Sequence, residues 1–210
     1  MERLDDATTR RFRLVDVLSQ ARDHAEGATP VLLGIDGPSA SGKSTVAKRL
    51  AALGGAVLVE VDEFWTWGDD PAWWDYFVDH VLVPLASGRD AHFRARDWAT
   101  DTAGVATGEW VTTVASALVI VEGVTSTRRA VADRYAYRIW VDAPEASRLR
   151  RGIARDGEQH RDAWLDWLAV ERDFFAADQT DTRAHLHVHG EPTVPCDVLD
   201  EVIVHRRPQP

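Results

Sequence analysis

The sequence predicts an α/β domain in which helices cover both faces of a mainly parallel sheet. Six apolar runs have the length of buried strands, the last two with a weaker pattern: 31–36, 56–62, 117–123, 137–143, 185–190 and 200–204. Segments with helical periodicity separate these runs, and strands joined through helices pair in parallel. We therefore expect a three-layer α/β/α sandwich around about five strands.

Five amphipathic segments are expected to form the helices. In the first, residues 10–26, apolar side chains recur at helical spacing at Phe12, Val15, Leu18 and Ala21. We expect residues 1–28 to form an N-terminal helix packed on a single domain of residues 29–210. The other helices are expected from Lys43 onward, between Trp73 and Leu85, and at 145–156 and 161–177.

The composition fits one globular domain. The chain has 210 residues, of which 45% are hydrophobic and 28% charged. Its formal net charge of −10 argues against nucleic acid or an anionic membrane as a partner. The one cysteine, Cys196, is expected to be a buried structural thiol. Because there is no signal peptide, no membrane-spanning stretch and no disulfide pair, we expect a cytoplasmic protein.

The segment between the first apolar run and the next helix has the pattern Gly-x-x-x-x-Gly-Lys-Ser. Its residues are Gly37, Pro38, Ser39, Ala40, Ser41, Gly42, Lys43, Ser44 and Thr45. Glycines allow the backbone to curl so that its N–H groups point inward, and the following helix adds the positive end of its dipole. Lys43 can reach the β- and γ-phosphates, and Ser44, with Thr45 as a second candidate, can ligate Mg²⁺. The pattern predicts a nucleoside triphosphate site in a P-loop NTPase fold.

The absence of asparagine narrows the choice between ATP and GTP. The chain contains no asparagine, so the Asn-Lys-x-Asp motif that recognises guanine cannot be present. A GTPase switch is therefore disfavoured, and ATP is the expected phosphate donor.

Acidic residues end two of the predicted strands. Asp62 lies at the carboxyl edge of the sheet, where open α/β folds bind their ligands. A carboxylate there can orient an acceptor hydroxyl and accept its proton during phosphoryl transfer. Glu122 can hold Mg²⁺ opposite Ser44. The alternatives are a turn or helix cap for Asp62 and a solvated strand end for Glu122.

Four arginines lie within eight positions of the helix predicted at 145–156. A spacing of three and four puts Arg148, Arg151 and Arg155 on one face. Such a face can close as a lid, at about 145–160, and offset the negative charge of a phosphate. We expect Arg148 to contact ATP, and Arg151 and Arg155 to contribute to catalysis. The alternative is a solvated basic face.

Together these segments resemble the uridine-kinase-like branch of the P-loop kinases, relatives of phosphoribulokinase and pantothenate kinase. The resemblance spans residues 31 to about 190 and rests on GIDGPSASGKST, VDEFW, VIVEG and DAPEASRLRRGIARD. It implies an ATP- and Mg²⁺-dependent phosphotransferase that acts on a hydroxyl of a small molecule. The family pattern Asp-x-Phe-Tyr implies that Asp62 is the catalytic base, with Trp65 in place of the tyrosine. It also implies a magnesium role for Glu122 and a lid at 148–156.

The acceptor region follows the family pattern less closely. Family members that phosphorylate nucleosides have a Tyr-Asp-Phe segment followed three positions later by histidine. The matching stretch here is Arg96-Asp97-Trp98, with Asp101 at the histidine position. Trp98 keeps an aromatic surface, whereas Arg96 suggests an acceptor with a carboxylate or a phosphate. The expected substrate-binding residues are Asp62, Trp65, Arg96, Asp97 and Trp98.

Several functions stay open at this point. A nucleoside is the first choice of acceptor, and a nucleoside monophosphate, a sugar, a pantothenate-like acid or an antibiotic are the alternatives. A P-loop regulatory ATPase is the alternative outside the kinases, and self-association into a homo-oligomer is also open. Three histidines, His185, His187 and His189, alternate along a predicted strand and would share one face. A metal site there is conceivable but not favoured.

Overall fold

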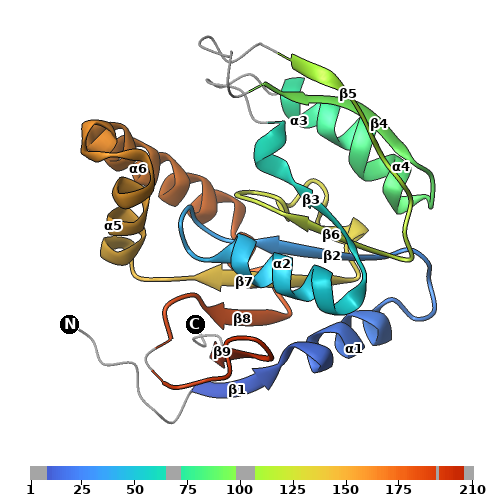
Figure 1. Ribbon diagram of the computed structural model, residues 1–210, viewed down its shortest axis with the longest axis horizontal. Coiled ribbons are helices and arrows are strands. Elements are labelled where there is room, and N and C mark those ends of the chain that lie inside the picture. Colours follow the sequence, from blue (N-terminus) through green and yellow to red (C-terminus); the bar gives the residue numbers. More distant parts are fainter. Residues whose placement is uncertain (1–8, 65–71, 98–106, 193, 206–210) are drawn as a thin grey trace.

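The central sheet is parallel through most of its width. The computed structural model describes residues 9–64, 72–97, 107–192 and 194–205. Its described part contains a seven-stranded sheet, in the order β1–β9–β8–β7–β2–β6–β3. The strands are β1 (Thr9–Arg13), β2 (Val31–Asp36), β3 (Val57–Glu60), β6 (Leu118–Glu122), β7 (Tyr137–Asp142), β8 (Leu186–His189) and β9 (Glu201–His205). β3, β6, β2, β7 and β8 pair in parallel, which confirms the prediction, and β9 and β1 extend one edge antiparallel (Figure 1).

Helices cover both faces of this sheet because its strands bury side chains on both sides. All six residues of β2 are buried, and successive residues point to opposite faces. Leu33 and Ile35 belong to a hydrophobic cluster with α1 (Leu14–His24) and α2 (Lys43–Gly54). Leu32 belongs to a second cluster with the helical segment 72–86. The predicted three layers are therefore present (Figure 1).

The helical segment 72–86 changes its hydrogen-bond pattern midway. α3 (Ala72–Phe77) continues through a π-helical turn, η2 (Val78–Leu82), into α4 (Val83–Ala86). Pro84 has no N–H to donate to the preceding turn, which accounts for the interruption of the α-helical pattern. Five of the six apolar side chains that predict this helix are buried, and Trp73 is half-buried; the buried ones are Trp74, Phe77, Val81, Leu82 and Leu85.

A separate two-stranded sheet packs on this helical segment, and the sequence does not predict it. β4 (Ala91–Arg96) and β5 (Thr107–Thr113) pair antiparallel. Ala91 and Phe93 are buried in the same cluster as Phe77 and Leu85. The small sheet and the segment 72–86 therefore form one packed unit.

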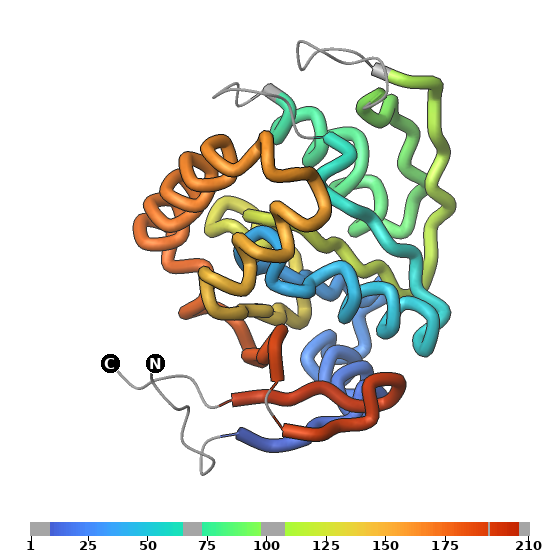
Figure 2. Tube along the Cα trace, turned by 60° about the vertical axis from the view of Figure 1, so that its left-hand side comes forward, coloured from blue at the N-terminus to red at the C-terminus, as the bar shows by residue number. Residues whose placement is uncertain are grey.

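A pair of helices, α5 (Glu145–Asp156) and α6 (Arg161–Asp178), follows β7. The structure confirms the helix predicted at 145–156. The two helices approach closely at Gly152, where a Cβ would lie 2.4 Å from the ring of Trp164. In Figures 1 and 2, α5 and α6 stand on one side of the start of α2, and α3, β4 and β5 stand on the other.

The prediction of a helix from residue 10 is wrong at its start. Residues 10–13 belong to β1, because the edge of β9 offers backbone partners, beginning with Thr9 opposite His205. α1 therefore begins at Leu14, which is buried, whereas Val15 is exposed. The rest of the helix packs into the main hydrophobic cluster, as expected.

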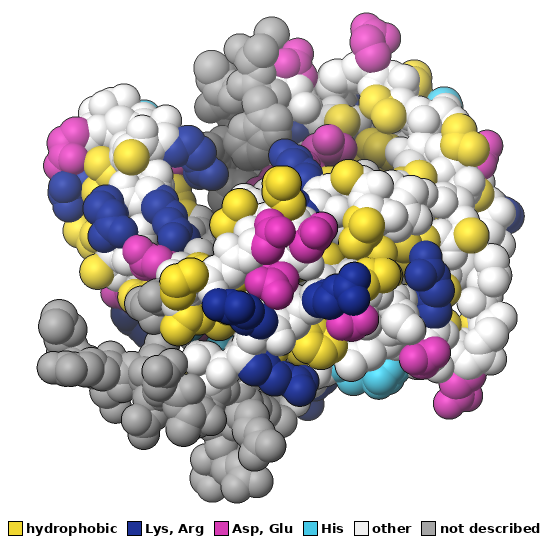
Figure 3. All heavy atoms as spheres, turned by 60° about the horizontal axis from the view of Figure 1, so that its bottom comes forward, with side chains coloured by type: hydrophobic (Ala, Val, Ile, Leu, Met, Phe, Trp, Pro, Cys, Tyr) yellow, Lys and Arg dark blue, Asp and Glu magenta, His cyan; other side chains and the backbone are white. Residues whose placement is uncertain are grey.

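The molecular surface shown in Figure 3 carries charges of both signs. Lys and Arg side chains are interspersed with Asp and Glu on this face, so it offers no continuous basic surface. Among the helices of the described ranges, none combines the length and the apolar character needed to cross a bilayer.

Candidate active site

The phosphate loop, residues 37–45, connects β2 to α2 at the carboxyl end of the sheet. Gly37 has a φ of +140°, and a Cβ there would lie 2.0 Å from the carbonyl oxygen of Val141, so only glycine fits. α2 begins at Lys43 without a side-chain cap and without an acid in its first turn. Its first N–H groups are therefore left to an anion. The chain passes from β6 on one side of β2 to β7 on the other. α/β sheets bind ligands at the carboxyl end of the strands at such a reversal of strand order.

Lys43, Ser44 and Glu122 meet beside this loop. Lys43 is 6% exposed, and its Nζ donates to the carbonyl oxygen of Pro38 (3.0 Å). Glu122, the last residue of β6, is 4% exposed. Burial raises the pKa of Glu122, while the charge of Lys43 and a hydrogen bond with Ser44 oppose this rise. A hydroxyl and a carboxylate are the hard oxygen ligands that Mg²⁺ prefers, so this pair fits the ion.

Asp62 lies in a 3₁₀ turn, η1 (Val61–Glu63), and its side chain is exposed. The strand predicted to include it ends earlier, at Glu60, because the chain turns there. The negative charge of Asp62 contributes to the raised pKa values of Glu122 and Arg155. The two carboxylates and the arginine therefore share one electrostatic environment.

Arg151 and Arg155 reach the same place from α5. Arg151 donates to the carbonyl oxygens of Ala40 (3.1 Å) and Gly190 (3.2 Å), so it spans from the phosphate loop to the end of β8. The Arg155 side chain is 68% exposed and pairs with Asp156 (2.7 Å). Hydrogen bonding to Asp156 raises the pKa of Arg155. α5 thus supplies two cations where the sequence predicts a lid.

Arg148, by contrast, lies behind the phosphate loop. It is 8% exposed, forms an ion pair with Glu171 of α6 (3.3 Å) and donates to the carbonyl oxygen of Ala143 (3.2 Å). Glu171 also accepts a hydrogen bond from the N–H of Ser39 (2.7 Å), and Trp167 donates to the Ser39 hydroxyl (2.8 Å). The geometry therefore gives Arg148 a supporting position behind the loop, and its contact with ATP stays a prediction.

A second buried acid holds the loop at its start. Asp36, the last residue of β2, is fully buried. Its carboxylate accepts hydrogen bonds from the N–H groups of Gly37 (2.7 Å), Thr125 (2.8 Å) and Thr127 (2.7 Å), and from the Thr127 hydroxyl (3.0 Å). Burial raises the pKa of Asp36 to about 6, against the opposing effect of these bonds. Asp36 thus ties the phosphate loop to the loop that follows β6.

The sequence contains a signal for both Asp36 and Glu171, although neither is among the predicted site residues. Asp36 ends a buried apolar run, as Glu122 does. Glu171 shares the buried face of α6 with Trp164 and Leu168, so it is a charge at an apolar position of the helix. A buried charge needs a partner, and both acids have one in the phosphate loop.

One cavity of about 530 Å³ joins the parts of the site. The predicted residues that line it are Ser39, Ala40, Gly42, Lys43, Ser44, Thr45, Asp62, Glu122, Arg151 and Arg155. The cavity continues past Gly190 to Cys196 and Val198 in the segment between β8 and β9. Cys196 is half-buried on the cavity wall, so the expectation of a buried structural thiol is wrong.

The predicted acceptor residues are only partly described. Trp65 and Trp98 lie outside the described residues. Arg96 is buried at the end of β4, and Asp97 follows it half-buried. Neither is among the residues that line the cavity of 530 Å³. Their contact with an acceptor stays a prediction.

Of the three histidines on β8 and the residue before it, His189 is among the residues that line the cavity of 530 Å³. The rings of His187 and His189 approach that of His205, with centroids 5.5 and 6.2 Å apart. The ring of His185 stacks on Tyr137 instead. Within the described residues, no three His, Cys, Asp or Glu side chains are placed to hold a metal ion.

Fold and site together define an α/β domain of the P-loop NTPase class with an arginine-bearing helix beside the phosphate loop. No family model and no curated protein matches the chain. Among solved structures it is similar to a possible uridine kinase from Bacillus stearothermophilus, with 19% identity over 83% of this chain and 96% of that one (TM-score 0.57). It is also similar to phosphoribulokinase from Rhodobacter spheroides, with 16% identity over 86% and 81% (TM-score 0.53). A third similar structure is D-glycerate 3-kinase from Cryptococcus neoformans, with 14% identity over 79% and 86% (TM-score 0.52). These similarities establish a shared fold and confirm the predicted fold class.

Proposed function

We propose that this protein is an ATP- and Mg²⁺-dependent phosphotransferase that phosphorylates a hydroxyl of a small molecule. The observation that carries the proposal is the single cavity in which Asp62, Glu122 and the phosphate loop meet. A bound triphosphate alone needs only the loop. A carboxylate that is free to face an acceptor, next to a second acid suited to Mg²⁺, fits phosphoryl transfer.

Each residue has a distinct part in this reaction. Lys43 and the first N–H groups of α2 hold the β- and γ-phosphates, and Ser44 and Glu122 would hold Mg²⁺. The bound ion would neutralise charge on the phosphate oxygens. Asp62 orients the acceptor hydroxyl and takes its proton as the oxygen–phosphorus bond forms and the bond to ADP breaks. Arg151 and Arg155 stabilise the charge on the transferred group.

A nucleoside is the first acceptor class to test. The motifs that resemble the uridine-kinase-like branch support it, and the similar structures are named for kinases of small hydroxyl compounds. A second class, hydroxyl compounds that carry an acidic group, is favoured by the arginine at position 96, where nucleoside kinases have tyrosine. The single cysteine, which cannot form a disulfide within the chain, supports a cytoplasmic location.

ADP release from the purified protein tests the proposal. Turnover is measured with ATP and Mg²⁺ alone and then with panels of nucleosides, nucleotides, sugars and hydroxy acids. We expect a low rate without acceptor and a clear stimulation by one panel. Rapid turnover that no acceptor changes would instead support a P-loop regulatory ATPase.

A further inference from the structure

Arg128 occupies an unusual position in the loop between β6 and β7. Its guanidinium lies over the ring of Trp74 in α3, 3.9 Å from the centroid, and 5.2 Å from the ring of Phe174 in α6. Its Nη2 donates to the Thr125 hydroxyl (2.6 Å) and its Nε donates to the Thr125 carbonyl oxygen (3.4 Å). The loop and two aromatic rings therefore fix the side chain between the two walls of the site.

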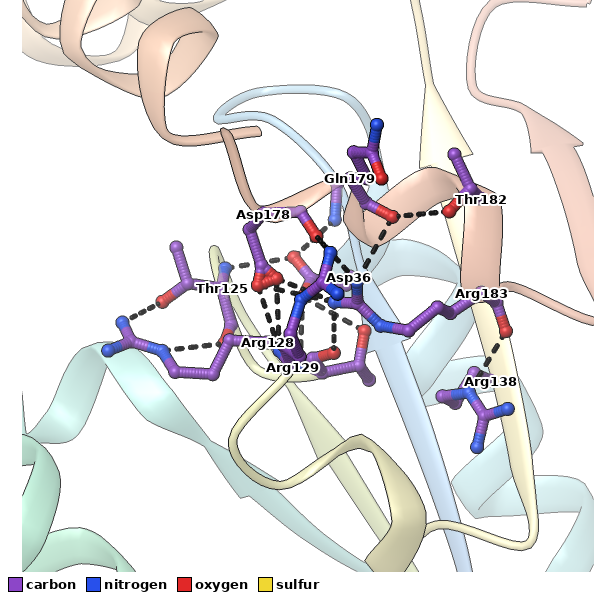
Figure 4. A network of polar contacts seen from close by, with 11 residues as sticks. Asp36, Thr125, Arg128, Arg129, Arg138, Asp178, Gln179, Thr182 and Arg183 are labelled. Carbon is purple, nitrogen blue, oxygen red and sulfur yellow. Dashed lines mark hydrogen bonds and ion pairs between the residues drawn. The ribbon is translucent and has the colours of Figure 1, made fainter. Parts of the chain in front are cut away.

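Within the described ranges, the guanidinium of Arg128 has no carboxylate at ion-pair distance. Asp178 is the nearby candidate, but it pairs with Arg183 (2.6 Å) and accepts from the N–H of Arg129 (2.8 Å). Figure 4 shows the Arg128 side chain extending away from the Asp178–Arg183 pair to meet Thr125. Burial lowers the pKa of Arg128, and the charges of Asp36 and Asp178 oppose this shift without forming an ion pair with it.

Arg128 contacts elements on both sides of the phosphate loop, Trp74 of α3 on one side and Phe174 of α6 on the other (Figure 1). Phe64 follows the turn that carries Asp62, and its ring packs on Phe77 of α3, 5.1 Å between centroids. Phe77 in turn packs on Trp74 (5.3 Å), the ring beneath Arg128. These buried rings connect the turn of Asp62 to the ring beneath the guanidinium. Arg128 itself lines a second cavity of about 500 Å³ with Phe174 and Asp178, and it is not among the residues that line the cavity of 530 Å³.

The hydrogen-bonding edge of Arg128 is also only partly used. Thr125 occupies Nε and Nη2, whereas no described residue accepts from Nη1. Thr125 is itself held by Asp36 (2.8 Å), so the anchor of the arginine is continuous with the start of the phosphate loop. A planar cation that is fixed on one edge and open on the other is suited to a carboxylate or phosphate.

We propose that Arg128 recognises an anionic group of the acceptor, so that the enzyme prefers hydroxyl compounds with a carboxylate or a phosphate over their neutral counterparts. This inference rests on the proposed phosphotransferase function and specifies its substrate class. It assigns Arg128 to substrate selection and leaves the chemical step to Asp62.

Matched acceptor pairs test the assignment. Each pair shares its hydroxyl groups and differs in one acidic group: glycerol and glycerate, ribulose and ribulose 5-phosphate, uridine and uridine monophosphate. Both ADP release and calorimetric binding to the protein with ADP and Mg²⁺ are measured for each member. The variant is Arg128→Gln, Arg128→Lys keeps the positive charge, and Arg129→Gln is the control at the adjacent arginine.

The wild-type protein should favour the anionic member of at least one pair. In Arg128→Gln the KM and Kd for that member should rise about 10- to 100-fold, with little change for the neutral member or for ATP. Arg128→Lys should keep part of the preference, and Arg129→Gln should keep all of it. The hydroxy acid and the two phosphates distinguish a carboxylate from a phosphate as the recognised group.

Two results would overturn the assignment. Turnover and binding that show no preference for the anionic member of any pair would refute it, and stimulation by any acceptor would leave the kinase function standing. An equal loss for both members of a pair in Arg128→Gln would show that Arg128 only supports the fold. Conversely, selective loss of anion binding without any phosphoryl transfer would support Arg128 as the anion-binding residue and refute the proposed function.

Discussion

Asp36 provides a direct test of how the buried carboxylate under the phosphate loop is balanced. Four donors reach it: Oδ1 accepts from the N–H groups of Gly37 and Thr125, and Oδ2 accepts from the N–H and hydroxyl of Thr127. These bonds favour the charged form, whereas complete burial disfavours it. The raised pKa, about 6 against an ordinary value of 3.8, means that burial outweighs the hydrogen bonds.

The consequence for stability has a definite sign. Because the folded protein binds the proton of Asp36 more tightly than the unfolded chain does, stability falls as the pH rises from about 4 to about 6. The difference between the two pKa values corresponds to roughly 3 kcal/mol. Asp36→Asn has no proton to lose, so wild type should lose about 3 kcal/mol relative to this variant between pH 4 and pH 7.

Urea unfolding of both proteins at several pH values measures this difference, since subtraction removes the other titrating groups. Asp166→Asn, on the exposed face of α6, is the control for loss of one carboxylate. A difference between wild type and Asp36→Asn that stays constant with pH would show that the hydrogen bonds compensate for burial. If wild type instead gains stability relative to Asp36→Asn as the pH rises, the hydrogen bonds to Asp36 outweigh the cost of its burial.

The remaining predictions concern catalysis, metal binding and the support of the loop. Asp62→Asn should lower kcat by about 100-fold or more with nearly unchanged ATP affinity, measured by ADP release and calorimetry; loss of ATP binding would contradict its role as base. Glu122→Gln should raise the Mg²⁺ concentration needed for tight ATP binding by about 10-fold, and an unchanged Mg²⁺ dependence would exclude it as a ligand. Glu171→Gln leaves Arg148 buried without its partner and should lower the free energy of unfolding by about 3 kcal/mol. The control Glu145→Gln, at the exposed partner of Arg148, should change it by less than about 1 kcal/mol, and equal effects would refute the argument.

The sequence predicts the fold well where burial is complete on both faces of an element. The residues of β2 and β6 are all buried, so their apolar runs are unambiguous. β1 reads Thr-Arg-Arg-Phe-Arg and is half-exposed, and its strand conformation depends on pairing with β9 at the other end of the chain. A local periodicity cannot contain that information, and the same limit applies to β4 and β5.

The site divides in a similar way. Lys43, Ser44, Asp62 and Glu122 belong to local patterns whose spacing is itself required by phosphate and metal binding, and the structure brings them to one cavity. Glu171 contacts Ser39 across 132 positions of the chain, so its role follows only from the packing of α6. For Arg148 the local spacing on α5 predicts a place in the lid, whereas its ion pair with the buried Glu171 holds it behind the loop.

Two buried acids, Asp36 and Glu171, restrain the shape of the phosphate loop. Asp36 holds the N–H of Gly37 and Glu171 holds the N–H of Ser39, while α2 fixes the far end of the loop. A loop held at three points has less conformational freedom to lose when it binds phosphate. Asp36 also binds the β6–β7 loop, and Glu171 belongs to α6; these are two of the elements that Arg128 contacts. The contacts that restrain the phosphate loop and those that hold Arg128 therefore belong to the same elements. We expect Arg128 to select the substrate without contacting ATP or the reacting hydroxyl.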